Sequence, residues 1–282
     1  MSLKLENVSY VYEQGTGSET AAIKNINLEI NKGEFVAIIG HTGSGKSTLI
    51  QHFNGLEKAT EGCVYYDEKD IQGKGFDLRG LRCKVGLVFQ YPEHQLFEES
   101  VIKDVCFGPK NKGLSKEECL EKAKEALQLV GISEELYDKS PFELSGGQKR
   151  RVAIAGVLAM EPEILILDEP TAGLDPAGRD KILRCIKKLH DVRGIAIVLV
   201  SHSMEDVANY AERIIVMNKG SIMYDDTPKK VFKHYKKLEK IGLAAPQITY
   251  IMHELKENGL EVDAGIINLE EAKDNILKSL GR

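Results

Sequence analysis

The sequence predicts an α/β fold in which an open sheet carries its chemistry at one edge. Apolar runs at 34–39, 85–90, 164–167 and 195–200 indicate buried strands. A glycine-rich segment follows the first of these runs directly, and two acidic residues follow the third. Because open α/β sheets bind ligands outside the carboxyl ends of their strands, we expect the functional residues to gather there.

Composition and charge are those of a globular chain with a sizeable core. The 282 residues are 42% hydrophobic and 29% charged. At roughly 150 residues per domain, this length allows one large domain or one domain with an appendage. A net charge of −5 provides no strong basic field for nucleic acid. The lysine-rich segment 229–240 is interpreted as a solvated helix face.

The cysteines and the first residues bear on the cellular compartment. The five cysteines are scattered and include no C-x-x-C pair, so neither a disulfide framework nor a zinc site is indicated. Free thiols suit a reducing cytosol. Residues 1–6 lack the apolar core of a signal peptide, and no apolar run approaches the roughly 18 residues that cross a bilayer. We therefore expect any membrane role to depend on a partner.

The segment after the first apolar run is the most specific motif of the chain. It matches the phosphate-binding pattern G-x-x-x-x-G-K-[ST], with an apolar strand before it and a helix after it. Its glycines let backbone N–H groups turn toward phosphate. Lys46 adds a positive charge between the β- and γ-phosphates, and the Ser47 hydroxyl can bind Mg²⁺. His41 is included as part of the loop, but its side chain is assigned no role. The predicted nucleotide-binding residues of this segment are Gly40, His41, Thr42, Gly43, Ser44, Gly45, Lys46, Ser47 and Thr48.

The acids Asp168 and Glu169 end a strand of four consecutive apolar residues. Carboxylates at such a position cost desolvation, which indicates a functional reason for their presence. Asp168 suits the hydration shell of Mg²⁺, a cation that keeps waters and takes few protein carboxylates. Glu169 points elsewhere and can polarise a water for in-line attack on a γ-phosphate. On an exposed loop the same two acids would carry no such meaning.

A second phosphate-binding turn precedes these acids in the chain. Ser145, Gly146, Gly147 and Gln148 open a predicted helix, and the free N–H groups and positive dipole of a helix start favour phosphate. Taken alone, these residues are also typical of a flexible loop. One chain hardly needs two phosphate sites so close together unless one of them serves another molecule.

Side chains at two other strand ends are further candidates. The amide of Gln90 can reach both a metal and an attacking water, although a glutamine there is also an ordinary polar strand end. His202 follows the last apolar run and can equally cap the next helix. Near the start of the chain, alternation at 3–12 predicts an antiparallel edge sheet. Tyr10 and Tyr12 share one face of it, where an aromatic ring either stacks on adenine or packs on the sheet.

Together these segments resemble the ATP-binding cassette (ABC) family over about the first 220 residues. The resemblance implies a P-loop nucleotide-binding fold with an antiparallel edge sheet, an inserted helical subdomain at about 91–160 and a small C-terminal extension. It implies ATP and Mg²⁺ as ligands. It also implies that the catalytic residues are Glu169, His202 and Gln90, and that the metal is held by Ser47, Gln90 and Asp168. Tyr12 would stack on adenine. The residues that would bind nucleotide across a subunit boundary are Ser145, Gly146, Gly147, Gln148 and Asp175.

Segments 89–97, 150–156 and 171–176 narrow the resemblance to the ATPases of energy-coupling-factor (ECF) importers, which take up vitamins and, in one branch, cobalt or nickel ions. The implied domains are an ATP-binding domain at 1–225 and a dimerisation extension at 226–282. The implied partners are a second ATPase subunit, identical or homologous, a transmembrane scaffold subunit and a membrane substrate-binding subunit. The chain would then lie at the cytoplasmic face of the cell membrane, and another polypeptide would recognise the transported substrate.

Two surfaces are expected to meet these partners. Ile248, Ile251, Met252 and Leu255 form an apolar stripe on a predicted helix, which we expect to pack on the ATP-binding domain or on a second subunit. The resemblance also implies that the membrane partner docks on the helical subdomain, although solvated surface is the simpler reading of each residue there. The residues concerned are His94, Phe97, Glu98, Glu99 and Asp104.

The alternative is a soluble ABC ATPase that acts on nucleic acid or ribosomes. A DNA-repair protein of this family would carry a long coiled coil or a zinc hook between Lys46 and Ser145, and this separation is short and contains neither. Translation-associated members usually have two cassettes in one chain, whereas one is found here. A binding module without hydrolysis would lack Glu169 or His202, and both are present.

Overall fold

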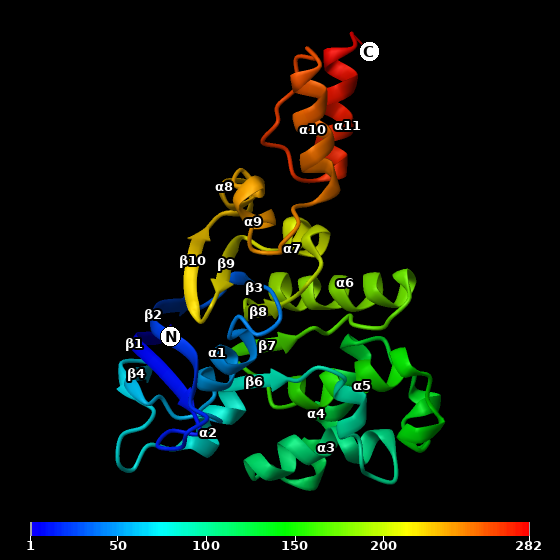
Figure 1. Cartoon of the computed structure of the whole chain (residues 1–282). Helices are drawn as coiled ribbons and strands as arrows, with labels where there is room; N and C mark the ends of the chain where they lie inside the picture. Colours follow the sequence, from blue (N-terminus) through cyan, green and yellow to red (C-terminus); the bar gives the residue numbers. More distant parts are fainter. Residues whose placement is uncertain (1, 282) are drawn as a thin grey trace.

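The computed structural model describes residues 2–281 and contains a central sheet, an antiparallel sheet beside it, a helical region and a C-terminal extension (Figure 1). The central sheet has the strand order β10-β9-β3-β8-β7-β6. All neighbouring strands in it run parallel except the pair β9 and β10. The strands are β3 (Phe35–Ile39), β6 (Val85–Val88), β7 (Ile164–Asp168), β8 (Ala196–Val200), β9 (Arg213–Asn218) and β10 (Ser221–Asp226).

The four apolar runs of the sequence are β3, β6, β7 and β8, so the predicted strands are confirmed. Every residue of β3, β7 and β8 is buried, as expected for a parallel sheet covered on both faces. One face packs against the antiparallel sheet and α1 (Lys46–Phe53). Helices of the helical region and α6 (Pro176–Arg193) pack on the other face, and α7 (Met204–Tyr210) joins the core beside β3 and β9.

The antiparallel sheet has the order β2-β1-β4-β5, which confirms the predicted edge sheet. Its inward residues, such as Leu5, Ile26 and Val64, share one core with Leu49 and Phe53 of α1. This packing fixes the start of α1 between the two sheets. The strands are β1 (Ser2–Tyr12), β2 (Thr20–Asn31), β4 (Glu61–Tyr66) and β5 (Lys69–Asp70), and α2 (Leu78–Lys84) follows them.

The helical region lies between β6 and β7 in the chain and forms the lower right of Figure 1. A capping box between Ser115 and Glu118 begins α4, which lies within the helical subdomain expected at about 91–160. Val101, Ala123 and Val152 from the three main helices belong to one core that continues into the central sheet. The elements are η1 (Pro92–Gln95), α3 (Val101–Lys112), α4 (Lys116–Leu129), η2 (Glu134–Leu136), η3 (Pro141–Glu143) and α5 (Gly146–Leu158).

The C-terminal extension has two parts that pack differently. Val231, Phe232 and Leu238 of the first part share a core with Ala37 of β3 and Val216 of β9. The second part is a helical pair that projects away from both sheets in Figure 1 and has its own small core. The helices are α8 (Pro228–Phe232), α9 (Tyr235–Glu239), α10 (Gln247–Glu257) and α11 (Leu269–Ser279).

The apolar stripe of α10 packs differently from what we expected. Ile248 and Met252 are buried against Ile266 and Ala272, so the stripe is covered mainly by α11 and the loop before it. Ile251 points outward and is 46% exposed. A pair of amphipathic helices can cover each other's apolar faces, and a stripe in the sequence does not say which partner covers it.

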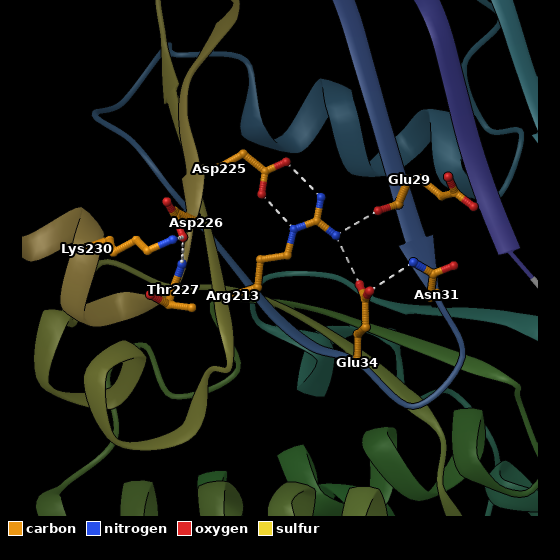
Figure 2. Close-up of polar contacts among 8 residues, drawn as sticks. All are labelled: Glu29, Asn31, Glu34, Arg213, Asp225, Asp226, Thr227 and Lys230. Atoms are coloured by element: carbon orange, nitrogen blue, oxygen red, sulfur yellow. Dashed lines mark hydrogen bonds and ion pairs between the residues drawn. The ribbon is translucent and has the colours of Figure 1, made fainter.

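Arg213 ties the two sheets together close to the root of the extension (Figure 2). Its Nε and Nη2 atoms donate to both carboxylate oxygens of Asp225, at 2.6 and 2.7 Å. Its Nη1 atom donates to the Glu29 carbonyl at 2.9 Å and to Glu34 at 3.1 Å. The adjacent Asp226 pairs with Lys230 at 3.0 Å, at the start of α8.

None of the helices in the described part of the chain has the length and apolar character that crossing a membrane requires.

Candidate active site

The carboxyl ends of β3, β6, β7 and β8 bring most of the predicted site residues to one edge of the central sheet. The segment 40–48 links β3 to α1, Asp168 ends β7, and Glu169 follows it. Gln90 lies just beyond β6 and His202 just beyond β8. The arrangement agrees with the expectation that parallel strands present ligand-binding groups at their carboxyl ends.

The segment 40–48 is closely packed against its surroundings. Gly45 precedes α1 with φ of 101°, a left-handed conformation that favours glycine. A Cβ on Gly45 would lie 2.5 Å from the Ala22 carbonyl, and a Cβ on Gly40 would lie 2.4 Å from Ser44 Oγ. No side chain caps the start of α1, so its first N–H groups remain available to an anion.

Lys46 lies inside this loop and is 6% exposed. Its Nζ atom donates to the Gly40 carbonyl at 2.7 Å and to the His41 carbonyl at 3.1 Å. Burial lowers the pKa of Lys46, since a buried ammonium group loses hydration. Ser44 Oγ is also buried and has no hydrogen-bond partner in the described chain. A buried cation and an unpaired hydroxyl in a loop of N–H donors fit the phosphates of a nucleotide.

Asp168 and Ser47 form the candidate metal site. Ser47 Oγ donates to Asp168 Oδ2 at 3.3 Å, and the Asp168 carboxylate is 8% exposed. Burial, together with the neighbouring Glu169 carboxylate, raises the pKa of Asp168. One carboxylate and one hydroxyl are hard oxygen ligands of the kind that Mg²⁺ takes while keeping several waters. The described residues contain no cluster of three or more acidic, histidine or cysteine side chains that could hold a metal by itself.

Glu169 is held from two sides. Gln90 Nε2 donates to its Oε2 atom at 2.9 Å, and His202 Nε2 lies 2.7 Å from its Oε1 atom. Its backbone has φ of 49°, an uncommon conformation that strained functional positions often adopt. The Glu169 N–H donates to the Val200 carbonyl at 3.0 Å, which ties this conformation to the end of β8. The structure therefore joins the three predicted catalytic residues in one cluster.

Tyr12 ends β1 and faces the same loop. Its hydroxyl lies 3.0 Å from Thr48 Oγ1, and its ring is 37% exposed. The ring of Tyr10 meets it edge to face, with centroids 4.8 Å apart, while the Tyr10 hydroxyl donates to Glu57 at 2.6 Å. Of the two tyrosines, Tyr12 is thus the one with a direct contact to the nucleotide-binding segment.

The Ser145 turn and Asp175 do not join this cluster. Ser145 and Gln148 form a capping box at the start of α5, with bonds of 3.4 and 2.9 Å to each other's N–H groups. The surroundings of Gly146 are open, because nothing lies within 4 Å of a Cβ built on it. Asp175 caps α6 by accepting from the Gly178 N–H at 2.9 Å.

Arg150 lies close to the predicted catalytic residues, which its sequence context did not reveal. It lies one turn into α5, is 2% exposed, and pairs with Glu93 beyond the Gln90 strand end. It also donates to the carbonyls of Pro170 and Ala172, which follow Glu169. An arginine near a helix start is ordinarily a solvated residue, so only the burial of Arg150 distinguishes it.

Comparison with known proteins agrees with this geometry. The family model described as ABC transporter matches residues 23–172. An energy-coupling factor transporter ATP-binding protein, EcfA2 of Caldanaerobacter subterraneus subsp. tengcongensis, is 58% identical over 280 residues, which span 99% of this chain and 98% of that protein. The chain belongs to the ABC ATPases of energy-coupling-factor transporters. The expected family and enzymatic class, an ABC-type ATPase, are thereby confirmed.

Solved structures of ABC ATPases share the fold. CbiO1 from Clostridium perfringens, described as part of the ABC transporter complex cbiONQ, gives a TM-score of 0.75 at 43% identity, covering 89% of this chain and 98% of that chain. A dimeric post-hydrolysis state of the cassette MJ0796, bound to ADP and Pi, gives a TM-score of 0.72 at 36% identity, covering 80% of this chain and 98% of that chain. The predicted fold class of this ABC ATPase is confirmed.

Proposed function

We propose that this ABC ATPase binds ATP with Mg²⁺ and hydrolyses it to power an ECF-type importer for a vitamin or a transition metal ion such as cobalt. The observation that carries the chemistry is the Glu169 carboxylate, held between Gln90 and His202 at the sheet edge that also holds Lys46. The name of the EcfA2 relative favours a transporter subunit over a soluble ABC ATPase acting on nucleic acid or ribosomes.

The segment 40–48 supplies the binding part of the proposed site. Its N–H groups and the Lys46 ammonium group would surround the β- and γ-phosphates, and the ring of Tyr12 would stack on adenine. Ser47, Asp168 and Gln90 would hold Mg²⁺, which neutralises the charge that develops on the transferred phosphoryl group. These assignments use oxygen donors and one amine that the structure gathers at one edge of the sheet.

Glu169 supplies the chemical part. It would accept a proton from a water molecule as the water oxygen bonds to the γ-phosphorus. The bond between that phosphorus and the β–γ bridging oxygen breaks, and the products are ADP and phosphate. Gln90 would orient the water. His202 would contact the γ-phosphate and also hold Glu169, since its Nε2 atom lies 2.7 Å from Glu169 Oε1.

The remaining predicted residues imply a second subunit. Ser145, Gly146, Gly147, Gln148 and Asp175 make only local contacts in the hydrogen bonds described above, so we assign them to the site of a partner ATPase, identical or homologous. The ATP-binding domain at 1–225 would form this pair, and the extension at 226–282 would add to its interface. A transmembrane scaffold subunit and a membrane substrate-binding subunit would hold the pair at the cytoplasmic face of the membrane.

The substrate class rests on resemblance alone. The CbiO1 structure is described as part of the complex cbiONQ, and the sequence resembles a family that includes cobalt and vitamin importers. Since a membrane subunit would select the substrate, no residue of this chain is assigned to that choice. Uptake of radiolabelled vitamins and cobalt by vesicles carrying the assembled complex would identify the substrate.

Lys46→Ala tests the nucleotide site directly. Hydrogen bonds to charged groups contribute about 1.5–3 kcal/mol each, so ATP affinity should fall by roughly 10- to 100-fold, at 1.4 kcal/mol per factor of ten. Fluorescence titration with a labelled ATP analogue measures this, with the exposed Lys32→Ala as the matched control. An affinity within a few-fold of wild type for Lys46→Ala would refute the assignment.

A further inference from the structure

Arg150 is the largest fully buried side chain of the described chain, and its hydrogen-bond partners Glu93, Pro170 and Ala172 lie within three residues of Gln90 or Glu169 in the chain. Its Nε and Nη2 atoms donate to the two carboxylate oxygens of Glu93, at 3.0 and 2.6 Å. Its Nη1 atom donates to the Pro170 carbonyl at 3.3 Å and also to the Ala172 carbonyl. A planar guanidinium group fixes the direction of each of these bonds, which an ammonium group does not.

These bonds connect three segments that carry separate parts of the proposed chemistry. Glu93 belongs to η1, three residues after Gln90. The Pro170 carbonyl belongs to the residue after Glu169. Arg150 itself belongs to α5, whose first turn begins at Ser145. One side chain therefore joins the loop of Gln90, the loop of Glu169 and the helix of the Ser145 turn.

The Gln90 loop has a strained backbone at the point where Arg150 meets it. Tyr91 adopts φ of 55°, which is costly for a bulky residue and persists only when the surroundings impose it. The Arg150 guanidinium lies 5.8 Å from the centre of the Tyr91 ring. Burial opposes ionisation of Glu93, but its hydrogen bonds to Arg150 hold the pKa of this carboxyl below its usual range. The pair is therefore charged and holds the loop in this conformation.

A purely structural role explains these contacts less well. Replacing a buried ion pair by apolar residues is often neutral or stabilising, so stability alone does not account for a charge at this position. Arg213 shows the structural case in the same molecule: it is more exposed, with 27% of its side chain accessible, and its partners lie on or directly beside strands of the two sheets. The partners of Arg150 are loops on both sides of the catalytic carboxylate.

We propose that Arg150 is a positioning residue for hydrolysis: with Glu93, it sets the Gln90 and Glu169 loops relative to the helix that begins at Ser145. The inference rests on the proposed role of Glu169. It follows that loss of the guanidinium fork changes turnover and leaves nucleotide affinity intact, because Arg150 contacts neither Lys46 nor the segment around it.

Arg150→Lys and Glu93→Gln test this in the full-length chain within the assembly that hydrolyses ATP. A misplacement of about 1 Å can cost about 10²-fold, so we expect kcat to fall by about 10- to 100-fold in each variant. The dissociation constant for ATP should stay within about two-fold, since a positioning defect acts on the reaction and not on binding. The double variant should lose no more than the worse single variant, because both changes break the same pair.

Arg213→Lys is the matched control, because it also breaks a bidentate arginine–carboxylate pair but lies away from the catalytic cluster. It should lower the unfolding temperature and leave kcat unchanged. Should Arg150→Lys not fold, Glu93→Gln decides, since it keeps Arg150 and its carbonyl contacts. A normal kcat in the folded variants, or a loss in affinity equal to the loss in kcat, overturns the inference. Glu169→Gln in the same assay separates the two proposals: if it remains active, the proposed chemistry fails first.

Discussion

The two turns that we predict to bind phosphate differ in how many candidate ligand groups lie around each one. At the start of α1, Gly40 and Gly45 have protein atoms within 2.5 Å of where a Cβ would lie, and a buried lysine fills the loop. At the start of α5, Gly146 has nothing within 4 Å of such a Cβ, and Ser145 and Gln148 cap the helix themselves.

The difference indicates what each turn requires. The first turn has a cation, uncapped N–H groups and acids on neighbouring strands, so it can bind a nucleotide within one chain. The second has N–H groups on an open surface, and the segment that follows it carries no acids for a metal. In the shared site that we propose, a two-fold related subunit would present its phosphate to the second turn, and the converse would hold at the other site.

Glu169→Gln should have the largest effect, because it removes the carboxylate that we propose as the general base of the first site. The expected loss in kcat is roughly 10²- to 10⁴-fold, the usual contribution of general acid–base catalysis, with ATP still bound. Phosphate release and nucleotide titration measure the two quantities, and the exposed Glu257→Gln serves as control. Should turnover stay near normal, His202 becomes the first candidate for the base.

Mixing two inactive proteins tests whether the second turn serves another subunit. In homodimers of Lys46→Ala or of Ser145→Arg, each site carries one defect, so both proteins should be inactive. In a mixed dimer both defects fall in one site and the other site is intact. An equal mixture should regain roughly a quarter of wild-type ATPase activity, since half of the dimers are mixed and each has one intact site of two.

The control is each variant mixed with itself, assayed after the same incubation. Differential tagging confirms that mixed dimers form. If they form and remain inactive, the hypothesis that one intact site hydrolyses ATP by itself is contradicted. Crosslinking then tests whether the site is shared between subunits. In the variant Ser145→Cys, the introduced thiol should form an ATP-dependent disulfide with a cysteine placed beside Gly43 of the other subunit. A bond within one chain would contradict the shared site.

Alanine at a glycine of each turn compares their surroundings by stability. Gly45→Ala forces a side chain into a left-handed backbone and against the Ala22 carbonyl, so the free energy of unfolding should fall by about 1–3 kcal/mol or more. Gly147→Ala lies in the first turn of a helix with only Arg151 near it, at 4.0 Å, and should change stability by under about 1 kcal/mol. Urea unfolding measures both, and equal losses would mean that the second turn is as enclosed as the first.

Removal of the helical pair from residue 246 onward should have the smallest effect on the sites themselves. This cut leaves α8 and α9, whose side chains share a core with the central sheet. It removes α10 and α11 with their own small core, together with Tyr250 and Ile267, which pack on the core of α8 and α9. ATP binding should be unchanged, while the dimer should weaken without nucleotide because exposed Ile251 is lost. Sedimentation velocity measures the dimer, and an unchanged dimer would show that this surface takes no part in the dimer interface.

Local motifs made much of the site predictable. The glycine-rich segment, the acids at 168–169 and the apolar strands before them are each encoded by neighbouring residues, and the structure has them where the sequence indicated. The meeting of Gln90, Glu169 and His202 was also predictable, because each one follows a strand of the same sheet. Which atoms of Gln90 face Glu169 was not, since that depends on the loop that Tyr91 begins.

Long-range packing was the part that the sequence did not disclose. Arg150 lies in a helix beside two exposed or half-exposed neighbours, and no periodicity marks it as buried. The stripe of α10 predicted a helix correctly, but the identity of its covering surface depends on how the chain turns back at 258–268. In both cases the deciding contacts join residues that are distant in the sequence, so local patterns contain little information about them.

The hydrogen bonds of Lys46 make nucleotide recognition a competition between acceptors. Its ammonium group already has two carbonyl oxygens of its own loop, at 2.7 and 3.1 Å. When a phosphate replaces these carbonyls, the free energy gained at Lys46 is only the difference between its bonds to charged phosphate oxygens and its bonds to neutral carbonyl oxygens. A single small anion gains little from this exchange, whereas a triphosphate adds further contacts along the loop. We therefore expect the loop to favour a nucleotide with several phosphates over a single small anion, because the further contacts along the loop would offset the carbonyl bonds that Lys46 gives up.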